Sequence, residues 1–346
     1  MPAVGQRARV VLLNDTSRHN HHGCRRVVTT IHRCLADRGL AIIDTAPAGS
    51  QWSEDERFLR SMERADLILI NGEGTLHHAA GLGARLLEVV AHPARRNRPV
   101  ALINTIYQDN PSQWAEWLRQ MSLIATRDRS SQAEIQGLGL QAEYAPDLSL
   151  HFGSPGWSPR ATDGPIGYGD SVFPDVKRAL RQAYLREARP SLYLPIHTGI
   201  RHPAIASGWS VRRRLHNIRF GLRARLRNLR DRGYRVSNEV EGFIGDLRRT
   251  SIYLTGRYHG ICLAMAAGVP FRAVASNSHK IEALLREAGV RPERLAGSAP
   301  ELARTAPHEW RFSTEEAASL SAFLHEGRQR TETLFDRIAG LALQSR

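Results

Sequence analysis

The segment TGRYHG, residues 255–260, combines residue types suited to holding an anion. It lies between an apolar run and a helical pattern, so we expect it where a strand gives way to a helix. The first turn of a helix offers unpaired backbone N–H groups and a positive dipole end. Arg257 adds a guanidinium fork and His259 adds an imidazole that can change charge near neutral pH. We predict a phosphate or carboxylate site here, with Tyr258 and Gly260 as further binding residues; the alternative is a turn whose histidine only packs or caps.

Two other segments of the second half carry cationic candidates for the same site. Lys280, one of two lysines in the chain, ends the segment SNSHK at a predicted helix start. A cation there opposes the helix dipole, so a bound anion would explain it, although an exposed loop lysine is the alternative. His197 and Arg201 follow an apolar run at residues 192–196. We predict that both lie at the mouth of the same sheet and bind substrate.

A segment with two glycines, NGEGT at residues 71–75, follows a buried apolar run in the first half. Glycines after a strand let the backbone approach a ligand closely. We therefore predict that Gly72 and Gly74 contact substrate and that Glu73 between them is a candidate catalytic base. The alternative is a simple tight turn.

The segment NDTS at residues 14–17 follows the first predicted strand, and three histidines come directly after it. No acidic or cysteine side chain joins these histidines at ligand spacing, so we predict no metal site. A polar loop facing the substrate is favoured, with Asn14 in contact and Asp15 as a general base. Arg127 is a further binding candidate, for which a structural ion pair is the alternative.

Strands alternate with helices along both halves of the chain, which predicts parallel sheets covered by helices. In such sheets ligands lie beyond the carboxyl ends of the strands, where the segments above are found. Residues 153–169 are rich in Gly, Pro and Ser and are interpreted as a linker. We predict an N-terminal Rossmann-like domain at 1–155, a second at 156–310, and a helical segment at 311–346 packing back on the first.

Composition supports a globular protein of two domains. The 346 residues are 42% hydrophobic and 24% charged. Lys and Arg number 48 against 34 Asp and Glu, a net charge of +14 that suits an anionic substrate, a nucleic acid or an anionic membrane surface. Three cysteines without CxxC spacing give neither a disulfide framework nor a zinc signature. No apolar run is long enough to span a bilayer or to form a signal peptide, so a cytoplasmic protein is expected.

An arginine-rich segment at residues 211–232 shows an apolar stripe at helical spacing. A core-packed helix with a solvated basic face explains the pattern. Docking on the inner face of the cell membrane is the functional alternative. No nucleic-acid motif accompanies the arginines, so no nucleic-acid partner is predicted.

The motifs together resemble the polysaccharide pyruvyl transferase family. The matching segments occur in the same order, over roughly residues 65–290. They are NGEGTLHHA (71–79), TRDRSS (126–131), PD (146–147), TGRYHGICLAMAAGVP (255–270) and SHK (278–280).

The resemblance implies two facing Rossmann-like domains across a cleft, as in GT-B glycosyltransferases. It also implies transfer of a pyruvyl group from phosphoenolpyruvate to hydroxyls of a cell-surface polysaccharide, or of its polyprenyl-linked precursor, with formation of a ketal. The first domain would face the acceptor and the second would hold the donor.

The family's Arg-x-His motif, which binds the donor, falls on Arg257 and His259. His259 would act as an acid or as an electrophile at the phosphate, with Asp15 or Glu73 as base, and no metal or redox cofactor is required. Two alternatives stay open. One is a GT-B glycosyltransferase that uses a nucleotide-activated sugar, and the other is a non-catalytic relative that binds an anionic sugar or lipid.

Overall fold

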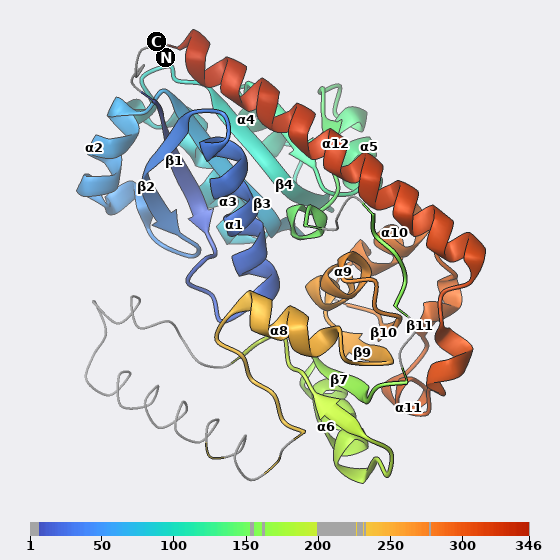
Figure 1. The fold of residues 1–346 in the computed structure, drawn as a ribbon. Helices are drawn as coiled ribbons and strands as arrows, with labels where there is room; N and C mark the ends of the chain where they lie inside the picture. The colour runs from blue at the N-terminus through green and yellow to red at the C-terminus, as the bar shows by residue number, and fades with distance from the viewer. Residues whose placement is uncertain are drawn as a thin grey trace, which may run out of the picture. The chain divides into compact units, whose positions relative to one another are not determined.

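The computed structural model describes residues 7–152, 156–160, 163–198, 226, 231, 233–276 and 278–345. The chain divides into two compact units, each built around its own parallel sheet (Figure 1). Unit 1 comprises Met1–Thr16, Val28–Leu148 and Gly327–Arg346, and unit 2 comprises Ser17–Val27 and Ser149–Glu326.

Unit 1 contains a six-stranded sheet in the order β2-β1-β3-β4-β5-β6, with every pair parallel. The central strand β4 is buried at eight of its nine positions, as expected for a parallel sheet covered on both faces. The strands are β1 (Ala8–Asp15), β2 (Leu40–Pro47), β3 (Leu67–His77), β4 (Val100–Gln108), β5 (Leu123–Thr126) and β6 (Glu143–Tyr144). The helices are α1 (His22–Ala36), which begins in unit 2, α2 (Glu56–Arg64), α3 (Gly81–Leu87), α4 (Trp114–Leu118) and α5 (Arg129–Gly137).

The segment at residues 71–75 forms part of strand β3, so the strand does not end before Asn71 as predicted, and the alternative of a simple tight turn there is wrong. Glu73 pairs with Thr105 of β4, and a Cβ added to Gly72 would lie 2.4 Å from the Thr105 Cβ. Gly72 is therefore needed for close approach of two strands and does not reverse the chain. Glu73 has a φ of 40° and lies where the pairing register shifts. The strand is thus irregular at the carboxylate.

Unit 2 contains a five-stranded parallel sheet in the order β11-β10-β9-β7-β8. Helix α9 is buried at all nine positions, which fits the apolar sequence that follows His259. The strands are β7 (Ile166–Ser171), β8 (Ser191–Tyr193), β9 (Ile252–Gly256), β10 (Phe271–Val274) and β11 (Leu295–Ala296). The helices are α6 (Pro174–Arg186), α8 (Val240–Leu247), α9 (Tyr258–Ala266), α10 (Lys280–Glu287) and α11 (Ala299–Ala303).

Strand β7 lies partly inside the range interpreted as a linker, and that interpretation is wrong for residues 166–169. The sequence IGYGDS resembles a loop because of its glycines, yet β7 pairs with both β8 and β9. A Cβ added to Gly169 would lie 2.5 Å from the Tyr253 hydroxyl, and one added to Gly167 would lie 2.9 Å from Thr250. These glycines leave room for neighbouring side chains within the sheet.

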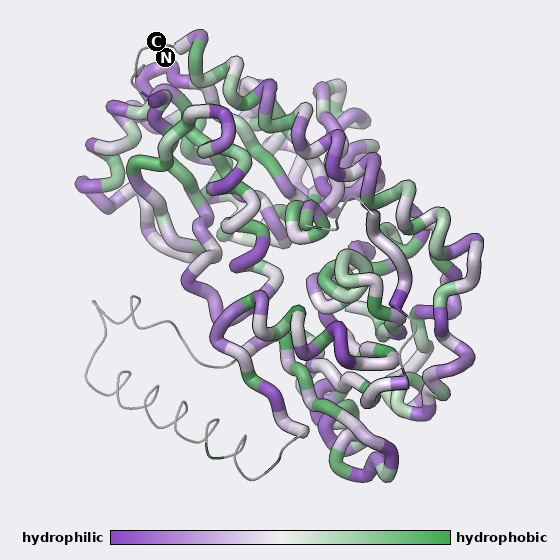
Figure 2. Tube along the Cα trace, viewed as in Figure 1, coloured by the Kyte–Doolittle hydropathy of each residue, from purple (hydrophilic) through white to green (hydrophobic). Residues whose placement is uncertain are grey.

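The predicted C-terminal helix is present as α12 (Thr314–Gln344), along which hydrophobic and hydrophilic residues alternate (Figure 2). In unit 2 its first turns bury Leu320 and Leu324 in the core. In unit 1 its later turns bury Phe335 and Ile338, and Arg38 pairs with Glu332 at 2.8 Å. The predicted fold class, two parallel α/β units followed by a C-terminal helix, is confirmed.

The predicted basic helix at 211–232 lies outside the described residues, except for Leu226 and Asp231. Within the described part of the chain, no helix has both the length and the apolar character needed to cross a membrane.

Candidate functional site

Arg257 lies at the carboxyl edge of the unit 2 sheet, between β9 and the first residue of α9, so the predicted strand-to-helix turn is present. Its Nε and Nη2 each lie 3.1 Å from Oδ2 of Asp170, at the end of β7. Asp170 is fully buried, whereas the Arg257 side chain is 18% exposed. The buried carboxylate therefore orients the guanidinium while part of the fork stays accessible to a ligand.

The backbone around Arg257 is held by a second set of contacts. The Thr255 hydroxyl donates to the Asp170 carbonyl at 3.2 Å and accepts from the Arg257 N–H at 3.1 Å. The other Asp170 oxygen accepts from the Ile196 N–H at 3.0 Å. This network connects the ends of β7 and β9 with the segment after β8. Because these contacts hold Arg257 in place without a ligand, the site is preorganised for binding.

Three histidines gather beside Arg257 in unit 2. The ring centroids of His21 and His259 are 5.2 Å apart, and those of His21 and His197 are 6.4 Å apart, both edge-to-face. His21 and His197 also form a backbone bridge. Burial lowers the pKa of His21 well below its usual value, and nearby His259 and Arg257 add to the shift. Burial also lowers the pKa of His197, against the opposing charge of Asp170, so both imidazoles are neutral at pH 7.

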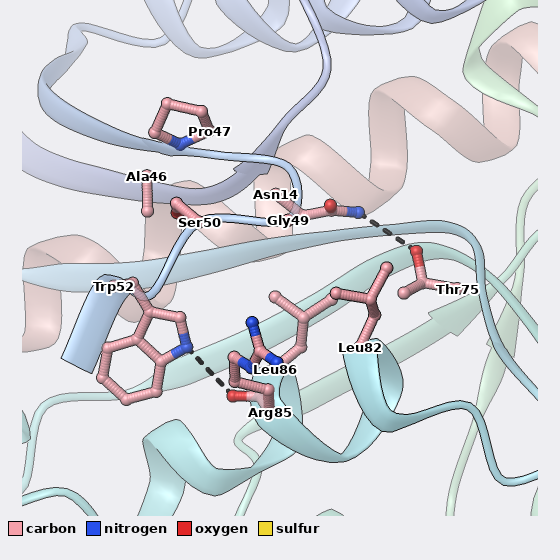
Figure 3. Close-up of a pocket in the computed structure, with 10 residues that line it drawn as sticks. All are labelled: Asn14, Ala46, Pro47, Gly49, Ser50, Trp52, Thr75, Leu82, Arg85 and Leu86. Atoms are coloured by element: carbon pink, nitrogen blue, oxygen red, sulfur yellow. Dashed lines mark hydrogen bonds between the residues drawn. The ribbon is translucent and has the colours of Figure 1, made fainter. Parts of the chain in front are cut away.

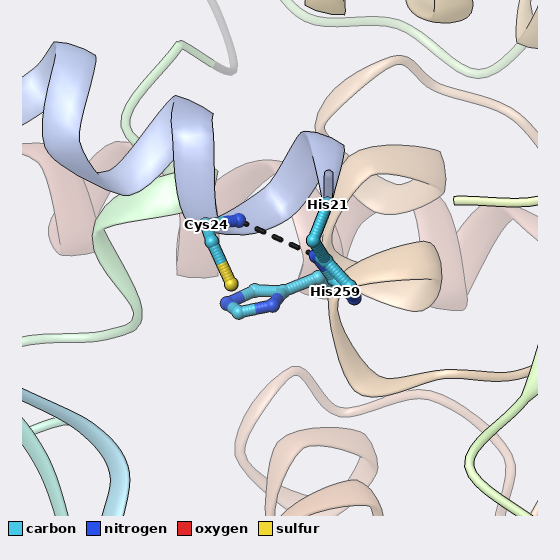
Figure 4. Close-up of side chains that lie close together, drawn as sticks. All are labelled: His21, Cys24 and His259. Carbon is cyan, nitrogen blue, oxygen red and sulfur yellow. Dashed lines mark hydrogen bonds between the residues drawn. The ribbon is translucent and has the colours of Figure 1, made fainter. Parts of the chain in front are cut away.

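The position of His259 depends on Gly23. A Cβ added to Gly23 would lie 2.2 Å from both Cβ and Cγ of His259. His259 thus packs directly on the backbone of the first turn of α1. Cys24, the next residue, has its side chain beside the His259 ring, and its N–H lies 3.4 Å from Nδ1 of His21 (Figure 4).

A second polar group lies in unit 1, where Glu73 is buried in the carboxyl half of β3. Its Oε1 accepts from the Thr16 hydroxyl at 2.5 Å and from Nδ2 of Asn71 at 3.0 Å. Asn14 donates to the Asn71 carbonyl at 2.6 Å, and Asn104 donates to Oδ1 of Asn71 at 3.3 Å. These contacts join three adjacent strands around one carboxylate.

Strained backbone marks the same place. Asn14, Glu73 and Asn104 have φ values of 60°, 40° and 55°, in the left-handed region that side chains rarely adopt. Such strain persists where surrounding contacts impose it, and it clusters at functional sites. The group is therefore the best candidate in unit 1 for contacting a substrate.

A small pocket opens beside Asn14, whose side chain donates to the Thr75 hydroxyl at 3.2 Å (Figure 3). Trp52 lies across the pocket and donates from its indole to the Arg85 carbonyl at 3.0 Å. Leu82, also at the pocket, is half exposed. Trp52 is only 3% exposed and packs in the core of unit 1, so its ring forms the wall of the pocket and is not open to a ligand.

Of the remaining predicted site residues, Arg127 and Asp15 lie near the Glu73 group: Nη2 of Arg127 is 3.6 Å from the position of a Cβ added to Gly74, and Asp15 follows Asn14. Arg127 contacts Asp147 at 3.2 Å with both side chains buried, which favours the structural alternative for this arginine. Asp15 is buried at the end of β1, and Lys280 is the first residue of α10. Arg201 lies outside the described residues.

Two predicted residues lie against the core of unit 2. Tyr258 is buried at the start of α9. A Cβ added to Gly260 would lie 2.9 Å from the Thr255 hydroxyl, so this glycine makes room for the contact that holds Arg257.

Three groups of residues in the candidate site were not predicted from the sequence. Asp170 directly follows the range interpreted as a linker, and its only signal is an acidic residue after alternating apolar positions. Gly23 and Cys24 gave no signal because their partner, His259, is more than 200 positions away. Asn71 and Asn104 lie inside strands, where amides are usually depleted, and that anomaly was a usable signal.

Comparison with known proteins supplies the family. The family model described as polysaccharide pyruvyl transferase matches residues 15–278, which is more than half of the chain. No curated protein sequence matches the chain.

Solved structures share the fold at low identity. A UDP-GlcNAc 2-epimerase from Neisseria meningitidis bound to UDP-GlcNAc has a TM-score of 0.52 and 9% identity, over 95% of this chain and 100% of that one. A putative UDP-N-acetylglucosamine 2-epimerase from Listeria monocytogenes has a TM-score of 0.51 and 9% identity, over 91% of each chain. An α-glucosyltransferase in complex with UDP has a TM-score of 0.49 and 9% identity, over 95% of this chain and 99% of that one.

The similarity to the two epimerases establishes a shared fold and does not establish a shared function. The family match covers both halves of the chain, and the TGRYHG turn of unit 2 lies inside it. The chain therefore belongs to the polysaccharide pyruvyl transferase family, a family of transferases.

Proposed function

We propose that the protein transfers a pyruvyl group from phosphoenolpyruvate to two hydroxyls of a polysaccharide or of its lipid-linked precursor. Unit 2 binds the donor at Arg257, and unit 1 binds the acceptor at the polar group around Glu73. The observation that carries the proposal is the guanidinium of Arg257, which lies directly before α9 and is held by the buried carboxylate of Asp170 while part of it stays accessible. The family to which the chain belongs gives this arginine its proposed ligand. Phosphoenolpyruvate carries a phosphate and a carboxylate, for which an arginine fork and a helix start are fitting ligands.

The reaction divides into an addition and a substitution at C2 of the donor. One sugar hydroxyl adds to C2 while C3 takes up a proton and becomes a methyl group. A second hydroxyl then replaces the phosphate at C2, and inorganic phosphate leaves. Each hydroxyl loses its proton, for which Glu73 is the base favoured by its fixed carboxylate and Asp15 is the alternative.

His259 lies on the donor side of this scheme. It follows Arg257 by two residues and contacts the first turn of α1 through Gly23. From there it acts on the donor as an acid, or as part of an electrophilic group at the phosphate. Lys280, and Arg201 outside the described residues, are the proposed additional anchors for negative charge.

A nucleotide-sugar glycosyltransferase is the second candidate. It is favoured by the likeness in fold to UDP-GlcNAc 2-epimerases, because the same arginine could hold a nucleotide phosphate. The two functions differ in donor, so donor binding separates them.

A thermal-shift titration with phosphoenolpyruvate, run beside CMP, UDP and GDP, tests the proposal. A ligand that binds only the native state stabilises it by about 2.7 kcal/mol at a hundred times its Kd. We expect phosphoenolpyruvate alone to raise the melting temperature. Stabilisation by a nucleotide without any by phosphoenolpyruvate would assign the glycosyltransferase function instead.

The packing of His259 on Gly23 gives a further prediction. Gly23→Ala places a methyl group inside the present position of the imidazole, so the ring must move by an ångström or more. We expect phosphoenolpyruvate to bind about tenfold more weakly, and overpacking to cost about 1–3 kcal/mol of stability. Calorimetric titration at a temperature where the variant is folded measures the first effect.

Gly245→Ala is the matched control, because Gly245 lies in α8 with open space around its Cα. It should bind the donor as the wild type does and be slightly more stable, since alanine is the better helix former. Normal donor binding by a folded Gly23→Ala variant would remove His259 from the donor site.

A further inference from the structure

The side chains of His21, Cys24 and His259 form a compact set of metal-ligating groups in unit 2 (Figure 4). Each offers one ligand atom, and these atoms all lie within 4.8 Å of one another. Two imidazole nitrogens and one thiolate are ligands that Zn²⁺ takes in proteins, and this set of two histidines and one cysteine falls within its preference.

The set is assembled from two distant parts of the chain. His21 and Cys24 are three residues apart at the start of α1, so the first turn of the helix brings their side chains to the same side. His259 arrives from the start of α9 and reaches them because Gly23 has no side chain. The prediction of no metal site was based on finding no cysteine or acidic side chain at ligand spacing from the histidines near residue 20. The spatial set joins one of them to Cys24 and to a histidine of the second half.

We propose that His21, Cys24 and His259 bind one transition-metal ion of the zinc class, with a fourth coordination position open to a solute. Tetrahedral zinc with Zn–N of about 2.0–2.1 Å and Zn–S of about 2.3 Å places its ligand atoms about 3.3–3.6 Å apart. Small side-chain rotations, which move each ligand atom by about an ångström, would bring the three atoms from their present spacing to that geometry.

Three protein ligands leave one position for water or substrate, which is the arrangement of catalytic rather than structural zinc. The charges around the set are compatible with a bound cation. Asp170 balances the charge of Arg257, and the Cys24 thiolate would offset one charge of the ion. A His259 imidazole that coordinates the ion cannot also act as a general acid, so with metal bound His259 takes the other role proposed above, as part of an electrophilic group at the phosphate. The anionic group would then contact the metal and the accessible part of Arg257 together. The metal site itself does not depend on the identity of that anion.

Cobalt substitution tests the site without any substrate. Tag-free protein is stripped with a chelator and titrated with Co²⁺, and the absorption spectrum is recorded. We expect one equivalent to bind, with the thiolate charge-transfer band and the intense visible bands of tetrahedral cobalt. Zinc should displace the cobalt and should raise the melting temperature of the metal-free protein.

Cys24→Ala should abolish the charge-transfer band and lower zinc affinity at least tenfold. Cys262→Ala is the matched control, since Cys262 is a second buried cysteine of unit 2 outside the set, and it should keep the spectrum. A band that survives in Cys24→Ala, or wild-type protein that binds less than stoichiometric cobalt, would overturn the proposal.

A second variant covers the case in which Cys24→Ala fails to fold. His21→Ala should then lose the tetrahedral visible bands, and an unchanged spectrum in that variant would equally overturn the site. Donor binding is measured separately, by the phosphoenolpyruvate titration of metal-free and zinc-loaded protein. Metal binding without donor binding would reject the proposed function and leave the metal site standing.

Discussion

Arg257→Ala is expected to abolish stabilisation by phosphoenolpyruvate while the protein stays folded. The guanidinium is accessible enough to bind an anion, and a hydrogen bond to a charged group contributes about 1.5–3 kcal/mol. A loss of that size weakens donor binding by about tenfold to more than a hundredfold. Calorimetric titration of wild type and variant measures it, with Arg248→Ala, an exposed arginine of the same unit, as the control.

Asp170→Asn extends the same prediction to the residue that positions Arg257. The change keeps the shape of the side chain but removes the charge that holds Nε and Nη2. We expect weaker donor binding than in the wild type and stronger binding than in Arg257→Ala, because the arginine remains but is no longer oriented. Arg257→Lys should also bind poorly, since an ammonium cannot reproduce the fork. Normal donor titrations in all three variants would exclude Arg257 as the anion ligand.

Glu316→Gln is expected to destabilise unit 2 by about 3–5 kcal/mol, the usual cost of leaving one charge of a buried ion pair without its partner. Arg294 is fully buried and contacts the Glu316 carboxylate twice, through Nε at 2.8 Å and Nη2 at 2.7 Å. Its Nη1 donates to the Phe271 carbonyl at 2.8 Å, which connects the first turn of α12 to strand β10. Urea unfolding followed by circular dichroism measures the loss.

The acid dependence of this pair follows from the pKa of Glu316. Burial alone would raise that pKa, but hydrogen bonds from Arg294 and from the Arg291 backbone lower it from 4.5 to about 2. A carboxyl whose pKa is lowered on folding contributes stability above its unfolded pKa and loses it as the pH falls. The difference between wild type and Glu316→Gln should therefore be complete above about pH 5 and should shrink between about pH 4.5 and 2.

Glu315→Gln is the control for this prediction, because it makes the same charge change at the neighbouring exposed position of α12. Its unfolding midpoint should move far less than that of Glu316→Gln. Equal effects of the two variants would show that overall charge, rather than the buried pair, determines the stability.

The sequence alone was sufficient for most of the fold. The strands β1, β4, β9 and β10 have a local signal because a strand covered on both faces is a short continuous apolar run. The amphipathic helices between them have one because their apolar positions repeat at the helical period. The turn that holds Arg257 was also predictable, since a buried strand followed directly by an apolar helix leaves the intervening polar residues at the sheet edge.

The glycine-containing strands were not predictable from local patterns. In β3 and β7, glycine occurs because Thr105 and Tyr253 of neighbouring strands occupy the space where a side chain would be. That reason exists only once the sheet has formed, so the sequence by itself suggests a turn and a linker.

What the sequence by itself determined is the fold class, the family, and the presence of Arg257 and His259 in one strand-to-helix turn. Only the tertiary structure decided which residues contact them. Asp170 reaches Arg257 through strand pairing, and Cys24 reaches His259 because Gly23 lets two helix starts meet. The physical reason is that local patterns record burial and periodicity within one element. Charge pairing and metal-ligand geometry depend on atoms brought together from separate elements by the packing of the whole unit.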